Sequence, residues 1–254
     1  DQRLSPGEWS EVHNESLTPA TTATRGGLFL SSSPAQEVRI GYDYLMLVDP
    51  SISTDHTLYL RITEVMYHPE EATPAELAAG YLTSDFEYIE VKNVGIVPLD
   101  LSDVRFTKGI DFDFVTGAIT TLEGGGFALV VRNQAAFESR YGFGLPVAGE
   151  YMPDNLSNGG ENVKVSFGAG AAIKEFAYLD VAPWPTSPDG FGPTLVLIDP
   201  DSAPDHTMAA NWTASASTGG SPGAAEPSID LASWKASVFT AAELANPAIS
   251  GNLV

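Results

Sequence analysis

The sequence predicts an all-β protein with an antiparallel sandwich or barrel, and residues 86–133 carry the main observations. In residues 86–93, Ile89 and Val91 fall on one face of an extended chain, and Tyr88 and Glu90 on the other. A period of two with aromatic and β-branched residues is typical of a strand. Glycine and proline turns then separate further short extended segments. Several short strands at this spacing favour a sandwich or barrel.

The remaining strands are predicted by the same alternation. In the GIDFDF stretch, Phe112 and Phe114 face one way while Asp111 and Asp113 face the other. An apolar FALVVRN run is typical of a strand buried on both faces. The predicted strands beyond residues 86–93 are 57–67, 104–107, 109–114, 127–133, 162–167, 173–179 and 194–199.

Two short helices interrupt the strands. Thr73 is a candidate N-cap, with Pro74 in the first turn, Glu76 three residues after the cap and Gly80 as terminator. This combination of start and stop signals predicts a two-turn helix. Residues 134–142 predict a second helix across one end of the sandwich.

Five segments carry a resemblance to a known family. In chain order they are ITEVMYHP (62–69), FEYIEVKNVGIVPLDLSDVRF (86–106), FALVVRNQAAFESRYG (127–142), NLSNGGENVKV (155–165) and WPTSPDGFGPTLVLIDP (184–200). Taken together they resemble the bacterial branch of the lamin-tail domain family, across residues 58–223. The resemblance implies an immunoglobulin-like antiparallel β-sandwich with short helices and flanking N- and C-terminal extensions. It implies no catalytic residues, because the family shares none.

The chain is expected to divide into four parts. Residues 1–27 are expected to end a preceding β module and to form a linker, and residues 28–57 to hold an extra strand. The resemblance implies that residues 58–223 form a lamin-tail-like domain, and residues 224–254 are expected to be a linker and C-terminal tail. The sequence begins with DQRLSPGEWS, which shows no signal-peptide pattern and starts inside a strand-like segment. We therefore expect the chain to be a mature or excised part of a longer protein.

The extensions contain three specific features. The alternating residues 37–48 form a strand that is expected to pair with the first module, extend the main sandwich or pair with another chain. Residues 217–228, STGGSPGAAEPS, have the composition of a linker. In the tail, Thr240 and Glu243 form a capping box for one last helical turn.

Composition excludes several classes of function. The 254 residues include 33 acidic and 12 basic side chains and no cysteine, for a net charge of −21. Such a surface repels phosphate backbones, so nucleic acid is not an expected partner. The lack of cysteine excludes disulfides and thiolate sites. No apolar run approaches the ~20 residues of a membrane helix, so we expect no membrane insertion.

Two candidate catalytic or metal patterns are weak. The GGSPG sequence from Gly219 to Gly223 matches G-x-S-x-G, but Pro222 follows the serine and has no backbone N–H for an oxyanion. The expected strand and helix around the motif are also missing. The histidines are too scattered for a zinc pattern and are interpreted as surface or turn residues; they are His13, His56, His68 and His206.

A sequence motif that occurs twice in the chain raises the alternative of a cation site. Residues 47–57 and 197–207 share L-x-D-P-x-x-x-x-D-H-T. Asp199, Asp201 and Asp205 of the second copy offer oxygen ligands of the kind that calcium prefers. The loop lacks the aspartate and glycine of an EF-hand, so we favour turns built by the aspartate side chains.

Glu64 and Glu90 lie in the two strands that resemble the family best. We expect each to face solvent or to pair with a cation such as Lys92 or Arg105. A pair of carboxylates on a sandwich can also act as acid and base in glycoside cleavage, but nothing in the sequence brings these two together. The aromatic residues are expected mostly in the core or at domain ends, with a sugar-stacking platform as the alternative; they are Tyr42, Tyr44, Tyr59, Tyr67, Trp184 and Phe191.

The sequence therefore predicts a non-catalytic immunoglobulin-like module of a secreted or cell-surface bacterial protein, with a role in adhesion, assembly or display. It has no predicted catalytic, cofactor or metal residues. Its expected partner is a protein, a polysaccharide or another copy of itself. In self-assembly, residues 37–48 and 233–240 would add strands to a neighbouring sandwich. The alternative is an accessory domain of a secreted hydrolase, which binds a polysaccharide or positions the enzyme.

Overall fold

The computed structural model describes residues 53–151, 155–168 and 170–227, together with 240 and 243. All of them belong to Val48–Val254, one of the two compact units into which the chain divides. The predicted strand at 37–48 lies outside the described residues, as does the tail segment 233–240 apart from Thr240. Thr240 and Glu243 form the predicted capping box, since the backbone N–H groups of Glu243 and Thr240 each reach the other's side-chain oxygen, at 3.3 and 2.7 Å.

The largest sheet has six strands in the order β12-β11-β1-β2-β7-β8. All neighbours are antiparallel except β7 and β8, which run parallel, so the prediction of a purely antiparallel arrangement was wrong at this edge. The strands are β1 (Leu60–Met66), β2 (Tyr88–Asn93), β7 (Phe127–Val131), β8 (Val147–Glu150), β11 (Leu195–Leu197) and β12 (Trp212–Ala214).

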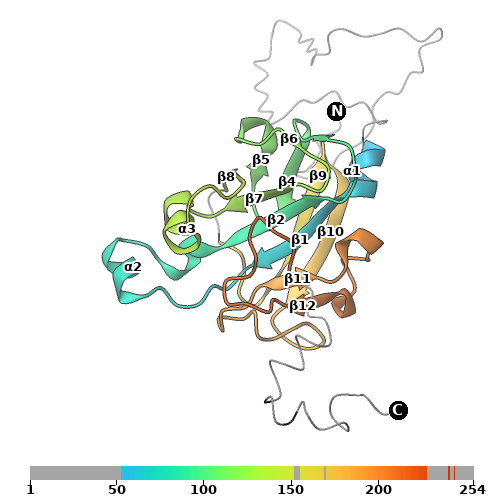
Figure 1. Cartoon of the computed structure of the whole chain (residues 1–254). Coiled ribbons are helices and arrows are strands. Elements are labelled where there is room, and N and C mark those ends of the chain that lie inside the picture. The colour runs from blue at the N-terminus through green and yellow to red at the C-terminus, as the bar shows by residue number, and fades with distance from the viewer. Residues whose placement is uncertain (1–52, 152–154, 169, 228–239, 241–242, 244–254) are drawn as a thin grey trace, which may run out of the picture. The chain divides into compact units, whose positions relative to one another are not determined.

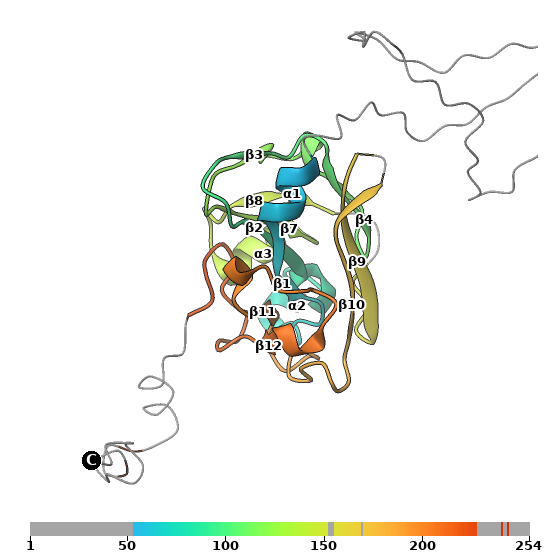
Figure 2. The same ribbon diagram turned by 90° about the vertical axis from the view of Figure 1, so that its right-hand side faces the viewer.

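A second sheet has four antiparallel strands in the order β10-β9-β4-β5, and a two-stranded ribbon joins β3 to β6. Figure 2 shows β4, β9 and β10 on one side of the molecule and β1, β2 and β7 on the other. The strands are β3 (Leu99–Asp100), β4 (Val104–Lys108), β5 (Phe112–Asp113), β6 (Thr121–Leu122), β9 (Gly160–Phe167) and β10 (Ala171–Leu179).

The two larger sheets share one hydrophobic core, which follows the predicted alternation. Ile89 and Val91 of β2 pack in the same buried cluster as Phe106 of β4, Val165 of β9 and Phe176 of β10. Fully burying a side chain of this kind contributes about 1.5–3 kcal/mol. The prediction of a β-rich fold is thereby confirmed.

Helices are few and short in the described part of the chain. The predicted capping box of α2 is present, since Thr73 Oγ1 accepts the Glu76 N–H and Glu76 accepts the Thr73 N–H. The positive φ of Gly142 ends α3 where the sequence predicted. The elements are α1 (Ser53–Tyr59), α2 (Pro74–Ala78) and α3 (Gln134–Tyr141), with 3₁₀ turns η1 (Thr83–Phe86), η2 (Phe114–Thr116), η3 (Pro200–Ser202) and η4 (Ala209–Asn211).

The start of β1 differs from the prediction. Thr57 and Tyr59 belong to the end of α1, and the strand begins at Leu60. The guanidinium of Arg61 folds back and donates to the carbonyl oxygens of Thr57 and Leu58, at 3.5 and 2.6 Å. A helix leaves its last carbonyls without intrahelical partners, and a cationic side chain that binds them stabilises this end. Arg61, the second residue of β1, therefore stabilises the end of α1.

Candidate functional site

Two glutamates that the sequence did not bring together lie directly opposite each other in the structure. Glu64 of β1 pairs with Glu90 of β2 in the strand register, just after an irregularity between Ile62 and Glu64. Both are almost fully buried, with relative exposures of 2% and 1%. Neither forms an ion pair with a cation in the part of the chain that the structure describes. The expectation that they face solvent or pair with Lys92 or Arg105 was wrong.

The side chain of Glu64 is held by hydroxyl and backbone donors. Its Oε1 accepts hydrogen bonds from Thr194 Oγ1 at 2.5 Å, from Tyr88 Oη at 2.7 Å and from the backbone N–H of Ser221 at 3.2 Å. Tyr88 comes from β2, Thr194 precedes β11, and Ser221 lies beyond β12. One carboxylate thus connects three segments that are distant in sequence.

Glu90 connects the sheet to the same C-terminal stretch. Its Oε1 accepts from Thr63 Oγ1 at 2.6 Å and its Oε2 accepts from the N–H of Gly223 at 2.7 Å. We call residues 216–227 the covering segment, because these contacts hold it over β1 and β2 (Figure 1). Glu226 closes the segment on itself by accepting from the Ala216 N–H at 2.6 Å and from Ser221 Oγ at 2.8 Å.

The covering segment was predicted to be a linker because it is rich in glycine, serine and alanine. Composition misses its role because the segment binds through backbone N–H groups, which every residue except proline carries. Burial of the two carboxylates follows from this cover. In a sheet with one exposed face they would lie in water.

Burial also changes the acidity of the pair. It raises the pKa of Glu64 to about 7, although the Thr194 and Tyr88 hydrogen bonds oppose this. Burial, followed by the charge of Glu64, raises the pKa of Glu90 to about 8. Two buried carboxylates at paired positions of neighbouring strands ionise one after the other, so near neutral pH the pair holds at least one proton.

The hydroxyl of Tyr88 gives geometric support for a protonated Glu64. Tyr88 Oη lies 2.7 Å from Glu64 Oε1 and 2.8 Å from the carbonyl oxygen of Gly219. A hydroxyl has one hydrogen and can donate to only one of these acceptors. When Tyr88 donates to Gly219, a proton on Glu64 completes the other contact.

A third buried glutamate also accepts hydrogen bonds from a tyrosine hydroxyl and a backbone N–H, in this case on another loop. Glu87, just before β2, accepts from Tyr151 Oη at 2.7 Å and from the N–H of Leu156 at 2.8 Å. Burial raises the pKa of Glu87 to about 7, against the effect of these two hydrogen bonds. Glu87 therefore anchors the stretch around residue 156, as Glu64 and Glu90 anchor the covering segment.

The serine of the G-x-S-x-G pattern has a structural partner. Ser221 Oγ donates to Glu226, and its N–H donates to Glu64, so both polar groups hold the covering segment. No histidine contacts Ser221 within the described residues, and Pro222 follows it. The geometry of a nucleophile elbow is not present here.

Two of the four histidines are buried, whereas surface or turn positions were predicted for all four. His206 is buried against Phe176 and Trp212, with ring centroids 5.8 and 5.7 Å apart, and burial lowers its pKa to about 4. His56 is buried beside Phe167, and its Nε2 lies 2.6 Å from the carbonyl oxygen of Asp100. His206 lies in a turn, as one of the two predicted alternatives has it, but neither histidine is at the surface. Burial among aromatic rings leaves no signal in the spacing of histidines along the sequence.

His68 is partly exposed and pairs with Asp189, with Nδ1 and Oδ1 2.6 Å apart. Histidine 13 lies outside the described residues. The described residues contain no group of three or more histidine, aspartate or glutamate side chains arranged to hold a metal ion.

The aspartate-rich loop after β11 forms turns. Asp205 accepts the N–H and the hydroxyl of Thr207, at 2.9 and 2.8 Å, which agrees with the turn interpretation. Asp199 adopts a left-handed conformation before η3, and Asp201 forms an ion pair with Lys92 at 3.0 Å. The three aspartates thus have separate partners or positions. Most of the first copy of this motif, residues 47–57, lies outside the described residues.

The aromatic residues divide between the core and the surface. Tyr67 stacks on Tyr178 with centroids 4.6 Å apart, and Trp184 packs near Trp212, so the core prediction is confirmed for these two. Phe191, by contrast, is 75% exposed.

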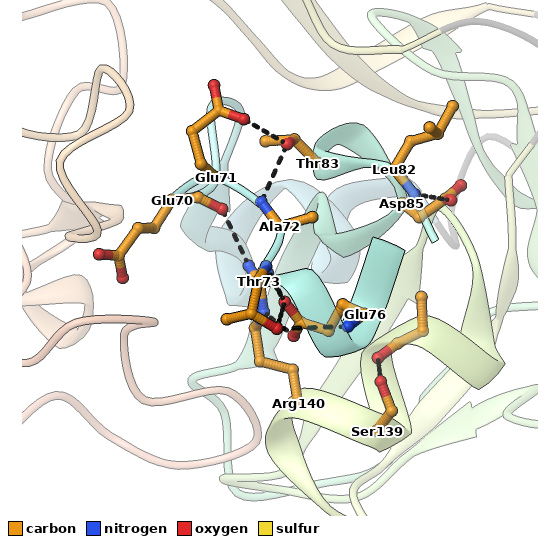
Figure 3. Close-up of polar contacts among 11 residues, drawn as sticks. Glu70, Glu71, Ala72, Thr73, Glu76, Leu82, Thr83, Asp85, Ser139 and Arg140 are labelled. Carbon is orange, nitrogen blue, oxygen red and sulfur yellow. Dashed lines mark hydrogen bonds and ion pairs between the residues drawn. The ribbon is translucent and has the colours of Figure 1, made fainter. Parts of the chain in front are cut away.

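A second polar cluster joins α2 to α3 (Figure 3). Arg140 donates from Nε and Nη2 to the two carboxylate oxygens of Glu76, at 2.9 and 2.8 Å. Its guanidinium carbon lies 3.4 Å from the ring centroid of Phe86. The hydrogen bonds from Arg140 are the main reason that the pKa of Glu76 is lowered, to about 2. The guanidinium and the carboxylate satisfy each other's hydrogen-bonding capacity, so we infer that this cluster stabilises the fold.

We expect Arg140→Lys to lower the free energy of unfolding by about 1–2 kcal/mol, because lysine cannot form the two-pronged contact or stack flat on Phe86. Urea unfolding measures the change. Lys108→Ala serves as control, since it removes a more exposed ion pair with Glu175, and exposed ion pairs contribute little to stability. Equal losses in the two variants would contradict this assignment.

Comparison of the chain with protein-family models, curated proteins and solved structures finds no match. Among the described residues, no helix has both the length and the apolar character needed to cross a membrane.

Proposed function

We propose that this chain is a non-catalytic, immunoglobulin-like binding or structural module of a secreted or cell-surface bacterial protein, with a role in adhesion, assembly or display. The observation that carries the proposal is how the protein uses its buried glutamates. Glu64 and Glu90 have the proximity that acid–base chemistry needs, yet they accept backbone N–H groups of Ser221 and Gly223. Carboxyl groups that bind the backbone of their own chain in this way stabilise the fold.

The proposal also draws on the lamin-tail resemblance of the sequence. Three segments that carry the resemblance form the adjacent strands β1, β2 and β7 of one sheet. A sheet edge or loop surface of such a module binds partners through exposed backbone and side chains. The acidic surface suits a soluble module that must not bind nucleic acid.

The test compares catalysis with binding in the full chain. We expect Glu90→Gln to leave any glycoside-hydrolase background unchanged, whereas the wild-type chain associates with itself in light scattering or is retarded by a polysaccharide in affinity gels. Retardation without self-association favours the accessory-domain alternative. Glu175→Gln is the matched control, because Glu175 is a half-buried acid on the other sheet that pairs with Lys108.

Turnover that Glu90→Gln abolishes and Glu175→Gln retains would show that the protein is an enzyme. A strictly monomeric chain at high concentration that no polysaccharide retards would count against the proposed module.

A further inference from the structure

An apolar cavity of about 590 Å³ lies between the large sheet and the covering segment. Its size is within the range of roughly 300–1,000 Å³ that is typical of ligand pockets. The outer faces of β1, β2 and β11 supply its floor, and η3 and β12 supply walls. The apolar walls include Phe127, Val196, Ile198, Ala214, Ala225 and Pro227.

The charges of this cavity are unbalanced. Glu64 and Glu90 line it with buried carboxyl groups, and Asp199, Asp201 and Glu226 lie at more exposed positions. The one cation in the lining is Lys92. Its ammonium is already engaged, 3.0 Å from Asp201 and 5.6 Å from the ring centroid of Phe127.

The buried pair lacks the counter-charge that such groups normally have. Acidic side chains are almost never fully buried unless they are paired with a cation. Neither Glu64 nor Glu90 has such a partner among the described residues, so protons take that place near neutral pH. Each carboxylate can accept about four hydrogen bonds. Glu90 accepts two in the structure, which leaves acceptor capacity for a donor that enters the cavity.

We propose that this cavity binds a lysine or arginine side chain on a short apolar segment of a partner protein. The cationic end would lie against Glu90 and Glu64, and the aliphatic stem and its apolar neighbours along the walls. This inference rests on the proposed binding function and names the chemistry of its partner. Charge complementarity selects this occupant, since an acidic or neutral apolar segment would leave the carboxyl pair without a cation.

The probe is the peptide N-acetyl-Gly-Leu-Lys-Leu-Gly-amide, and the same peptide with glutamate in place of lysine is its control. Titration into the full chain, followed by amide chemical shifts, measures affinity and location. We expect the lysine peptide to shift amides that line the cavity, and the glutamate peptide to shift none of them. We also expect tighter binding at pH 8.5 than at pH 6.5, because the carboxyl pair then carries more charge.

Charge variants separate an electrostatic site from a structural effect. At pH 8.5, Glu90→Gln should weaken binding of the lysine peptide about 10-fold or more, because it removes a carboxyl group that is charged at this pH. Lys92→Gln should strengthen it about 2- to 5-fold by removing a partly exposed repulsive charge. Asp199→Asn, which suits the left-handed backbone at this position, should weaken binding by a similar small factor without disturbing the fold. Glu175→Gln should leave affinity unchanged.

Equal binding of the two peptides, or shifts outside the cavity, would overturn the proposal, as would weaker binding in Lys92→Gln. If the chain self-associates or binds polysaccharide but not the lysine peptide, the proposed function stands and this inference fails. If the peptide binds as expected while glycoside turnover depends on Glu90, the site stands and the non-catalytic assignment fails.

Discussion

Gly220→Ala is expected to lower the free energy of unfolding by about 3–5 kcal/mol, in the range of the most damaging single substitutions. Gly220 has a φ of +75°, which disfavours any side chain. An added Cβ would lie 1.6 Å from Glu64 Oε1 and 2.7 Å from both Thr194 Oγ1 and Tyr88 Oη. The methyl group cannot fit unless the buried carboxyl group leaves its donors or the covering segment moves away.

Gly125→Ala is the matched control for this experiment. Gly125 has nearly the same φ, +76°, but an added Cβ meets nothing within 4 Å. The backbone cost of about 1–2 kcal/mol is therefore common to both variants, and the difference between them measures the contact at Glu64. Urea unfolding gives both values. Similar losses for the two variants would show that the covering segment is not fastened at this carboxylate.

Hydrogen exchange locates the damage. In Gly220→Ala we expect faster exchange of the Ser221 and Gly223 amides, which donate to Glu64 and Glu90, while the β4–β9 pairing keeps its protection. Protection is lost first where hydrogen bonds open locally rather than with global unfolding. A uniform loss of amide protection across both sheets would contradict a local opening of the covering segment.

Local patterns predicted the elements of this fold well. The capping box of Thr73 and Glu76, and the alternation that buries Ile89 and Val91, depend on residues a few positions apart. Such signals can be read along the chain because their energies are set by neighbours. A helical turn before β1 was missed because residues 57–59 continue the apolar pattern of the strand.

The glutamate pair could not be predicted because it depends on contacts between distant segments. The register that sets Glu64 opposite Glu90 includes an irregularity after Ile62, which shifts the pairing by one residue. A shift of this kind changes which side chains face each other across two strands. Their burial then depends on residues more than 130 positions later, since Gly223 donates its N–H to Glu90. The sequence of either strand alone carries no sign that the covering segment will bury these side chains.

The second large effect is a loss of stability of about 2–4 kcal/mol between pH 6.5 and 8.5, since a pKa shift of one unit corresponds to about 1.4 kcal/mol. Burial raises the pKa values of Glu64 and Glu87 to about 7 and of Glu90 to about 8, above the unfolded value of 4.5. The folded protein therefore binds more protons than the unfolded chain between these values. The resulting stability is fully present below pH 4.5 and is lost as the pH rises through 7 to 8.

Two other groups determine the choice of pH window. Burial lowers the pKa of His206 to about 4, so its contribution is lost as the pH falls below its unfolded value of 6.5. At pH 6.5 and above that effect is nearly constant. Burial also lowers the pKa of Lys174 to about 8, which makes stability rise with pH above 8 and partly opposes the loss from the glutamates.

Variants isolate the glutamates from these other groups. Urea unfolding of Glu90→Gln at pH 6.5 and 8.5 should show a smaller loss than the wild-type chain, because this group no longer ionises while His206 and Lys174 still titrate. Glu175→Gln should keep the full loss. If the wild-type stability is flat or rises over this window, or if Glu90→Gln loses as much as the wild type, the carboxyl group at Glu90 is ionised in the folded protein. The covering segment would then be held by a charged pair and not by shared protons.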